Sequence, residues 1–213
     1  MNKHESEAAP ADETGVVYIV DDDAASREAV SLLVEEMGVP SQDFESAEAF
    51  LEGYAGRRPA CLVTDVRMLR MSGLELQEEL ARRGVNLATI ILTAYADTPL
   101  TVRAIKNGAV TLLEKPCRDL ELWDAIREGL SLDAANCAKD RQRQQVAERL
   151  ATLSPAENAV LERVLAGEPN KAVAAALDVS IRTVEVRRQS LYTKMGADSL
   201  AELVRLVIEA RGG

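Results

Sequence analysis

The stretch VVYIVDDDAAS, residues 16–26, decides the fold class of this chain. Its first five residues are apolar or aromatic, which is the pattern of a short strand buried on both faces of a sheet. Three consecutive aspartates follow, although their charges repel one another. They favour either the start of a helix, whose positive end attracts carboxylates, or a site that binds a cation. The rest of the chain distinguishes these two explanations.

A strand followed by a helix is predicted five times before about residue 130. Apolar runs occupy residues 16–20, 61–66, 88–94 and 110–114, and a weaker strand is expected near residues 40–46. Helix signals lie between the runs: the stripe Val30, Leu33, Val34 and Met37 before Gly38, a capping box from Ser72 to Glu75, and Thr98 with Pro99. This alternation predicts an α/β fold with a doubly wound, five-stranded parallel sheet that helices cover on both faces.

The chain divides into four segments. Residues 1–14 are polar and acidic and are expected to form a flexible tail, and residues 15–130 form the α/β domain. Residues 131–151 are polar and lack glycine and proline, which predicts a helical linker. Residues 152–213 are expected to form a small all-α domain. Its four short helices are separated by Gly167, a turn at residues 178–180 and Gly196.

Composition excludes several classes of protein. No apolar run approaches the roughly 18 residues needed to span a bilayer, and the first residues lack a signal-peptide core, so a cytoplasmic protein without a membrane partner is expected. Cys61, Cys117 and Cys137 are odd in number and show no CxxC spacing, which argues against a disulfide framework or a zinc site. The only histidine, His4, lies in the tail, so any phosphohistidine must come from a partner.

Charge is distributed unevenly along the chain. Residues 1–130 carry 24 acidic and 13 basic side chains, a net charge of −11, whereas residues 131–213 carry 11 and 12, a net charge of +1. These values sum to the net charge of −10 for the whole chain. The second half alone is therefore suited to approach a polyanion.

Polar side chains stand at the carboxyl ends of four predicted strands. They are Asp21 and Asp22, Asp65, Thr93 and Lys115. In a doubly wound sheet the ligand site lies beyond these strand ends, so the side chains are expected to converge. Three carboxylates with a lysine and a hydroxyl suit a hard divalent cation, Mg²⁺, together with one phosphoryl group.

This set resembles the receiver domain of two-component response regulators, a flavodoxin-like fold. The motifs that carry the resemblance are VDDD, TDVRMLRMSGLEL, ILTAYADTP and LLEKP. The resemblance implies that Asp65 is the phosphoacceptor and that Thr93 and Lys115 contact the phosphoryl oxygens. It implies Mg²⁺ ligation by Asp21, Asp22, Asp65 and the backbone carbonyl of Arg67, and a cis peptide bond from Lys115 to Pro116. Asp23 is then expected to cap the following helix.

Two positions depart from the family pattern. Leu69 stands where proline is common, which is expected to loosen the loop after the phosphoacceptor. Leu112 stands where relatives often carry a tyrosine or phenylalanine that acts as a switch, so an aromatic flip is not available to this chain.

Residues 150–208 resemble the LuxR-type helix-turn-helix, and the whole chain resembles regulators of the FixJ/NarL type. The turn DVS at residues 178–180 precedes a basic segment that Ser180 is expected to cap. In the major groove of DNA this segment would place Glu185, Val186 and Gln189 nearest the base edges. Contacts mainly with phosphates are expected from Thr183, Arg187, Arg188 and Lys194, and Arg182 is a further expected DNA-binding residue. Many relatives carry histidine where this chain has Arg187.

The sequence therefore predicts a response regulator of a two-component phosphorelay that is not an enzyme. A cognate histidine kinase phosphorylates Asp65, and phosphorylation controls homodimerisation and binding to a double-stranded DNA operator, with RNA polymerase as a further partner. One alternative is a degenerate receiver that acts without phosphorylation. Another is a phosphatase of the haloacid-dehalogenase class, but those enzymes place a second aspartate where this chain has Arg67.

Overall fold

The computed structural model describes residues 15–211, so the expected tail at residues 1–14 lies outside the described residues. The first unit contains one five-stranded parallel sheet in the order β2-β1-β3-β4-β5. Its strands are β1 (Val16–Val20), β2 (Ser41–Phe44), β3 (Ala60–Asp65), β4 (Ala88–Thr93) and β5 (Ala109–Glu114). The prediction of a doubly wound sheet is confirmed. The edge strand β2 is mostly exposed, which explains its weak apolar signal.

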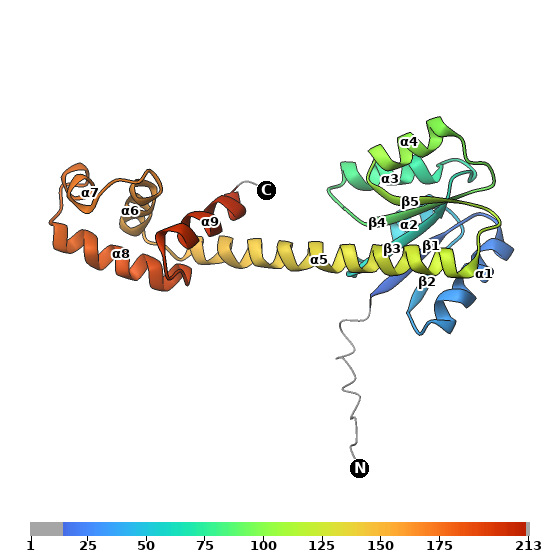
Figure 1. Ribbon diagram of the computed structural model, residues 1–213, viewed down its shortest axis with the longest axis horizontal. Coiled ribbons are helices and arrows are strands. Elements are labelled where there is room, and N and C mark those ends of the chain that lie inside the picture. Colours follow the sequence, from blue (N-terminus) through green and yellow to red (C-terminus); the bar gives the residue numbers. More distant parts are fainter. Residues whose placement is uncertain (1–14, 212–213) are drawn as a thin grey trace, which may run out of the picture. The chain divides into compact units, whose positions relative to one another are not determined.

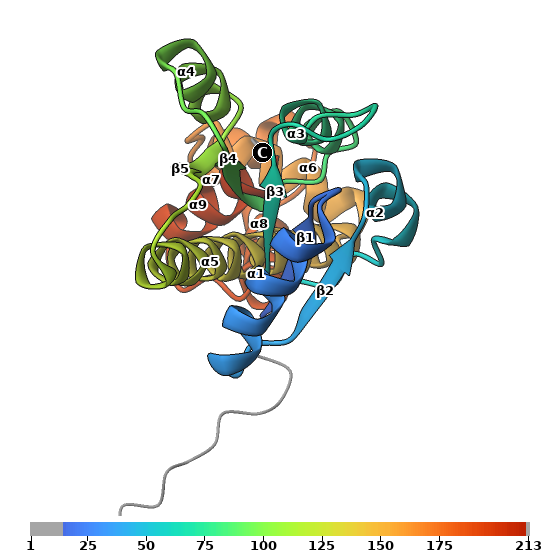
Figure 2. The ribbon, with the colours of Figure 1, turned by 90° about the vertical axis from the view of Figure 1, so that its right-hand side faces the viewer.

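Five helices cover the two faces of this sheet (Figures 1 and 2). They are α1 (Ala24–Glu36), α2 (Ala47–Gly53), α3 (Gly73–Arg82), α4 (Thr98–Lys106) and α5 (Asp119–Ala151). Helices α1 and α5 pack on the face that carries Ile19 and Val63. Helices α2 and α3 pack on the face that carries Tyr18 and Leu62, and α4 lies on that side against β5. Both sheet faces are thus buried, as the continuous apolar strands require.

Local capping explains where the receiver helices begin. The Asp23 side chain accepts a hydrogen bond from the Ser26 backbone N–H at 3.2 Å, so the third aspartate caps α1 as predicted. The capping box at Ser72 and Glu75 starts α3, and Pro99 lies in the first turn of α4. One detail of the expected α1 stripe is wrong: Met37 is exposed because it follows the last turn of the helix, at its C-cap.

Helix α5 is one continuous helix of 33 residues, and its bounds differ from the expected segmentation. The predicted division at residue 130 falls inside it, and the two compact units of the chain divide between Cys137 and Ala138. The reason lies in the last receiver turns: the buried carboxylate of Asp133 accepts hydrogen bonds from Arg58 and from the Ala60 backbone N–H. The linker is helical as expected, but its first residues belong to the receiver.

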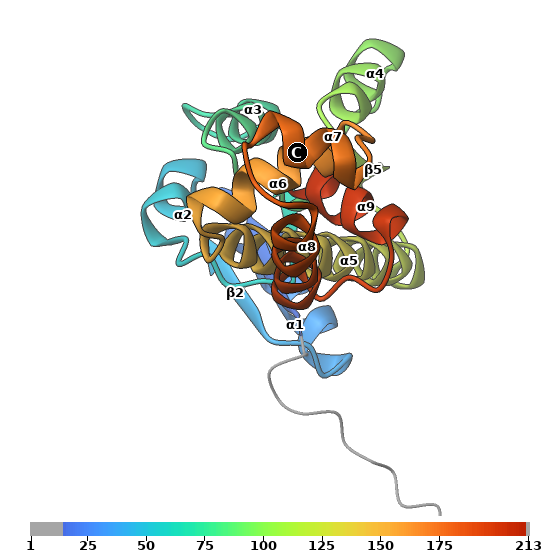
Figure 3. The same ribbon diagram turned by 90° about the vertical axis from the view of Figure 1, so that its left-hand side faces the viewer.

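The second unit contains the end of α5 and four further helices (Figure 3). They are α6 (Pro155–Leu165), α7 (Asn170–Ala176), α8 (Ile181–Met195) and α9 (Leu200–Arg211). Val146 from α5 is buried in their common core with residues such as Val160, Leu191 and Leu203. Ser180 caps α8 as predicted, and Gly196 ends it with a left-handed backbone that favours glycine. The expected small helical domain is confirmed.

Within residues 15–211, none of the helices combines the length and apolar character needed to cross a membrane.

Candidate phosphoryl-acceptor pocket and nucleic-acid interface

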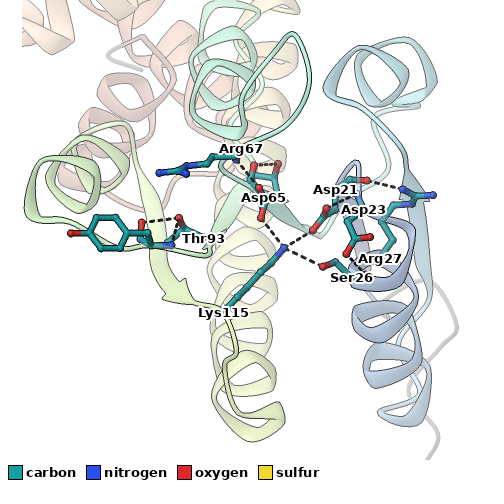
Figure 4. A network of polar contacts seen from close by, with 10 residues as sticks. Asp21, Asp23, Ser26, Arg27, Asp65, Arg67, Thr93 and Lys115 are labelled. Carbon is teal, nitrogen blue, oxygen red and sulfur yellow. Dashed lines mark hydrogen bonds and ion pairs between the residues drawn. The ribbon is translucent and has the colours of Figure 1, made fainter.

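Lys115 joins two of the predicted acids at the carboxyl edge of the sheet (Figure 4). Its Nζ lies 2.6 Å from Asp21 Oδ2 and 2.7 Å from Asp65 Oδ1, and it reaches Ser26 Oγ at 3.4 Å. Asp21 follows β1, Asp65 ends β3 and Lys115 follows β5, so residues 94 positions apart in the chain meet at one point. The parallel sheet is what brings them together.

Electrostatics hold this lysine in its charged form. Burial lowers the pKa of the Lys115 ammonium group, but hydrogen bonds to Asp21 and Asp65, together with their negative charges, outweigh burial. The pKa of Lys115 is therefore raised above its ordinary value. The site thus contains a charged ammonium group between two carboxylates.

Asp22 is turned toward the loop after β3. Its Oδ2 accepts a hydrogen bond from the backbone N–H of Leu69 at 3.0 Å. Proline, which the family resemblance leads one to expect at this position, has no N–H to donate. The substitution that was expected only to loosen the loop therefore supplies a tether between the loop and an acid of the pocket, while the Leu69 side chain is 77% exposed.

The Thr93 hydroxyl is bonded to the backbone of Tyr95, and the Arg67 backbone N–H is bonded to the Asp65 carboxylate. The Thr93 hydroxyl donates to the Tyr95 carbonyl at 2.9 Å and accepts from the Tyr95 N–H at 3.2 Å. The Arg67 N–H donates to Asp65 Oδ2 at 2.6 Å, which holds the second oxygen of that carboxylate. Thr93 lies at its expected strand end, but its hydroxyl is bonded to the following loop. The Lys115–Pro116 bond is cis, as predicted.

The expected convergence of three carboxylates is not observed. Within residues 15–211, no three carboxylate, cysteine or histidine side chains are close enough together to hold a metal ion. The physical reason is that the Lys115 ammonium occupies the space between Asp21 and Asp65, while Asp22 bonds to Leu69. The donor chemistry of the acids still fits Mg²⁺, because their carboxylates and the neighbouring carbonyls offer oxygen ligands.

Sequence reasoning missed two side chains at this site. Ser26 contacts Lys115, and Arg27 Nη1 donates to the backbone carbonyl of Asp21 at 2.8 Å, while its Nε reaches Asp43 Oδ2 at 3.3 Å. Both residues lie in the first turns of α1, directly after the acids (Figure 4). A helix capped by Asp23 must place its first turns beside the pocket, and this was the available signal.

Helix α8 presents one exposed face that carries three of the predicted base-reading residues. Arg182, Glu185, Val186 and Gln189 are exposed, and their spacing of i, i+3, i+4 and i+7 places them on one side of the helix. Val186 is 56% exposed. Arg182 Nη1 lies 3.8 Å from Glu185 Oε2.

The remaining predicted DNA contacts lie off this exposed face of α8. The Lys194 ammonium donates to Glu157 Oε2 at 2.7 Å and to the Thr152 carbonyl at 3.3 Å, so it is bonded within the domain. Thr183 Oγ1 lies 2.8 Å from the Ser180 hydroxyl. Arg187 is half-buried, and Arg188 is bonded to Asn170. The side chains expected to contact phosphates are thus partly engaged inside the unit.

Both units match known families. Residues 17–127 match the response regulator receiver domain, and residues 151–207 match the bacterial regulatory proteins of the luxR family. The transcriptional regulatory protein FixJ of Azorhizobium caulinodans is 43% identical over 91% of this chain and 92% of its own length. The response regulator protein TodT of Pseudomonas putida is 40% identical over 92% of this chain and 86% of its own length.

Solved structures agree with these matches. The response regulator StyR has a TM-score of 0.79 at 38% identity, covering 90% of this chain and 97% of its own. Full-length FixJ from B. japonicum has a TM-score of 0.56 at 39% identity, covering 92% and 97%. The chain belongs to the two-component response regulators, as a FixJ-like transcriptional regulator in which a receiver domain precedes a LuxR-type DNA-binding domain.

Proposed function

We propose that Asp65 is the residue through which this regulator is switched. In the transfer, the bond between phosphorus and the imidazole nitrogen of a kinase phosphohistidine breaks, and a bond from phosphorus to a carboxylate oxygen of Asp65 forms. The observation that carries this assignment is the ion pair of Lys115 with Asp65 and Asp21 at the carboxyl edge of the sheet. It places both Asp65 and Asp21 against the same cation, and Asp65, at the end of the central strand β3, is the one that the family resemblance implies as the phosphoacceptor.

The pocket residues have separate roles in this proposal. Lys115 stabilises the negative charge of the phosphoryl oxygens, and the Arg67 N–H holds the Asp65 oxygen that does not react. Thr93 exchanges its bond with Tyr95 for one with the phosphoryl group. Asp21, Asp22, Asp65 and the Arg67 carbonyl are the proposed Mg²⁺ ligands, and bound Mg²⁺ would neutralise charge on the transferring phosphoryl group.

The second unit is proposed to read DNA through α8. Glu185 and Gln189 suit contacts with cytosine N4 and with adenine N6 and N7, and Val186 suits apolar contact with a thymine methyl group. Arg182, Thr183, Arg187 and Lys194 are assigned mainly to phosphates, and the expected assignment of Arg188 is revised below. Phosphorylation would raise operator affinity by pairing two chains on a two-fold site. RNA polymerase is a further proposed partner, and the cytoplasm the proposed location.

Two alternatives are separated by specific residues. An aspartate-nucleophile phosphatase needs an acid and base two residues after the nucleophile, where Arg67 supplies neither at neutral pH. A receiver that acts without phosphorylation remains a second candidate, because Leu69 and Leu112 depart from the family pattern. The charged pair of Lys115 and Asp65 favours the phosphorylated mode.

The assignment is tested by treating the full chain with acetyl phosphate and Mg²⁺ and measuring the mass of the protein. We expect one added phosphoryl group in the wild type and none in Asp65→Asn. The matched control is Asp23→Asn, which removes a neighbouring charge but keeps a side chain that caps α1 well, and it should be phosphorylated normally. Equal uptake by Asp65→Asn and the wild type would contradict the assignment.

A further inference from the structure

The guanidinium group of Arg188 is directed toward α7 and away from the exposed face of α8. The residue is half-buried, and its Nη1 donates a hydrogen bond of 2.7 Å to Asn170 Oδ1. The exposed face contains Glu185, Val186 and Gln189, and a helix turns by about 100° per residue, so Arg188 lies on its flank. A short bond from a charged donor in this setting is stronger than an ordinary neutral one.

Tyr192 fixes the same guanidinium from a second side. Its hydroxyl accepts a hydrogen bond from Arg188 Nη2 at 3.4 Å, and Arg188 Cζ lies 5.9 Å from the centre of the tyrosine ring. This distance is within the range of a cation–π interaction. The ring is partly buried against the core of the second unit, so it offers a fixed platform. Arg188 is therefore ordered before any nucleic acid is bound.

Asn170 makes this contact important for the position of α7. It is the first residue of α7, and Pro169 before it provides no side-chain cap. The helix has seven residues and buries only Val173 and Ala174, so apolar packing holds its middle but not its start. Short helices depend on tertiary contacts for their stability. The hydrogen bond that Arg188 donates to Asn170 supplies such a contact at the start of α7.

We infer that Arg188 is a positioning residue for DNA sequence reading, and not primarily a phosphate contact. Together with Asn170 and Tyr192 it fixes the crossing of α7 and α8, and so the direction in which Gln189 and Glu185 face the groove. Contacts with base edges tolerate only small errors of placement, whereas attraction to phosphates is long-ranged. Loss of the contacts of Arg188 with Asn170 and Tyr192 should therefore reduce discrimination between DNA sequences more than it reduces overall affinity for DNA. This inference rests on the proposed reading of DNA by α8.

The test compares two duplexes with the full chain. One duplex is selected from a random library by the wild-type protein, and the other is its scrambled version. Affinity for both is measured at several salt concentrations for Asn170→Ala, Arg188→Ala and the double variant. We expect each single variant to lose about tenfold in preference for the selected duplex, and the double variant to lose no more than either single one. The dependence on salt should keep its slope.

Two further variants keep the test decisive if alanine variants unfold. Asn170→Asp retains the oxygen acceptor and should retain the preference for the selected duplex. The matched control is Arg187→Ala, one position earlier on α8. Within residues 15–211, the Arg187 side chain makes no hydrogen bond or ion pair that this variant would remove. This variant should weaken binding to both duplexes. It should also reduce the salt slope, which is the change of log affinity with log salt concentration, by about one unit.

A different set of results would overturn the positioning role. If Arg188→Ala reduces the salt slope by about one unit, leaves sequence preference unchanged and is not matched by Asn170→Ala, then Arg188 is a phosphate contact. If the losses of sequence preference add up in the double variant, Arg188 and Asn170 do not act through their shared hydrogen bond, and the inference is also contradicted. Failure of the proposed function itself is distinguishable, because the wild type would then select no duplex from the library.

Discussion

Asp133 in α5 and Arg58, which precedes β3, form a buried ion pair at the edge of the sheet opposite the acidic pocket. The Asp133 carboxylate is 0% exposed and receives Arg58 Nη2 at 2.6 Å and Arg58 Nε at 3.1 Å. It also accepts the Ala60 N–H at 2.7 Å. The side-chain hydrogen bond to Asp133 raises the pKa of Arg58, despite partial burial of the guanidinium. The pair ties the end of the receiver part of α5 to the start of the central strand β3.

Removal of Asp133 should destabilise the receiver strongly. In Asp133→Ala, Arg58 loses its carboxylate partner and the Ala60 N–H loses its acceptor, so we expect a loss of about 3–5 kcal/mol in the free energy of unfolding. Urea unfolding followed by the fluorescence of Trp123 measures it. Glu128→Ala, at an exposed position of the same helix, should change the stability by less than about 0.5 kcal/mol. A similar loss of unfolding free energy in both variants would show that the pair of Asp133 and Arg58 does not stabilise the receiver.

Magnesium should stabilise the folded chain. The acids at the carboxyl edge are expected to bind Mg²⁺ only when folded, so a concentration 100 times the dissociation constant would add about 2.7 kcal/mol. Thermal unfolding with increasing Mg²⁺ measures this effect. Asp22→Ala should remove most of it, whereas Asp23→Asn should keep it. An unchanged Mg²⁺ dependence in Asp22→Ala would mean that Asp22 serves only to bond Leu69.

Acid should weaken the DNA-binding unit through Glu157. Hydrogen bonds from Lys194, Ser190 and the Ser154 backbone and hydroxyl lower the pKa of Glu157 from 4.5 to about 2. A lowered pKa in the folded state contributes stability that is fully present above pH 4.5 and is lost as the pH falls toward 2. Melting temperatures of the wild type and Glu157→Gln, measured from pH 6 to pH 2.5, should therefore converge at the acid end. A constant difference between them across this range would contradict the role of Glu157.

Glu185 should favour specific binding to DNA and oppose non-specific binding. Its carboxylate repels phosphates but can accept a hydrogen bond from cytosine N4, and Arg182 lies 3.8 Å away. In Glu185→Ala we expect tighter binding to a scrambled duplex, together with a loss of about 1–3 kcal/mol of discrimination at one cytosine per half-site. Titrations with duplexes in which each cytosine is replaced by thymine measure this. Equal weakening on every duplex would place Glu185 outside the groove.

Much of the fold could be predicted from the sequence because local signals and long-range packing agree. The apolar runs gave the strands, the caps at Asp23, Ser72 and Ser180 gave helix starts, and Gly196 gave a helix end. The end of the receiver was not predictable, because the polar composition of α5 does not change at its last anchored turn. Asp133 resembles any solvated acid in the sequence, and only its pairing with a residue 75 positions away reveals its burial.

The candidate site was predicted by residue type and not by its arrangement. Strand ends identified Asp21, Asp65 and Lys115, which meet as expected. Three features depended on partners that a sequence does not show. They are the bond of Asp22 to the Leu69 N–H, the commitment of Lys194 to Glu157, and the bond of Arg188 to Asn170. In each case a charged side chain is bonded to a backbone group or to a side chain distant in sequence. The sequence does not distinguish such a residue from exposed charged residues nearby that make no such bond.

The most direct test of the account measures DNA affinity with and without a phosphodonor. The full chain is titrated against a duplex that it selects from a random library, before and after treatment with acetyl phosphate and Mg²⁺. We predict that treatment raises the affinity of the wild type at least about tenfold, because paired chains bind with avidity, and leaves Asp65→Asn unchanged. Equal affinity of the wild type before and after verified phosphorylation would contradict the account and favour a receiver that acts without phosphorylation.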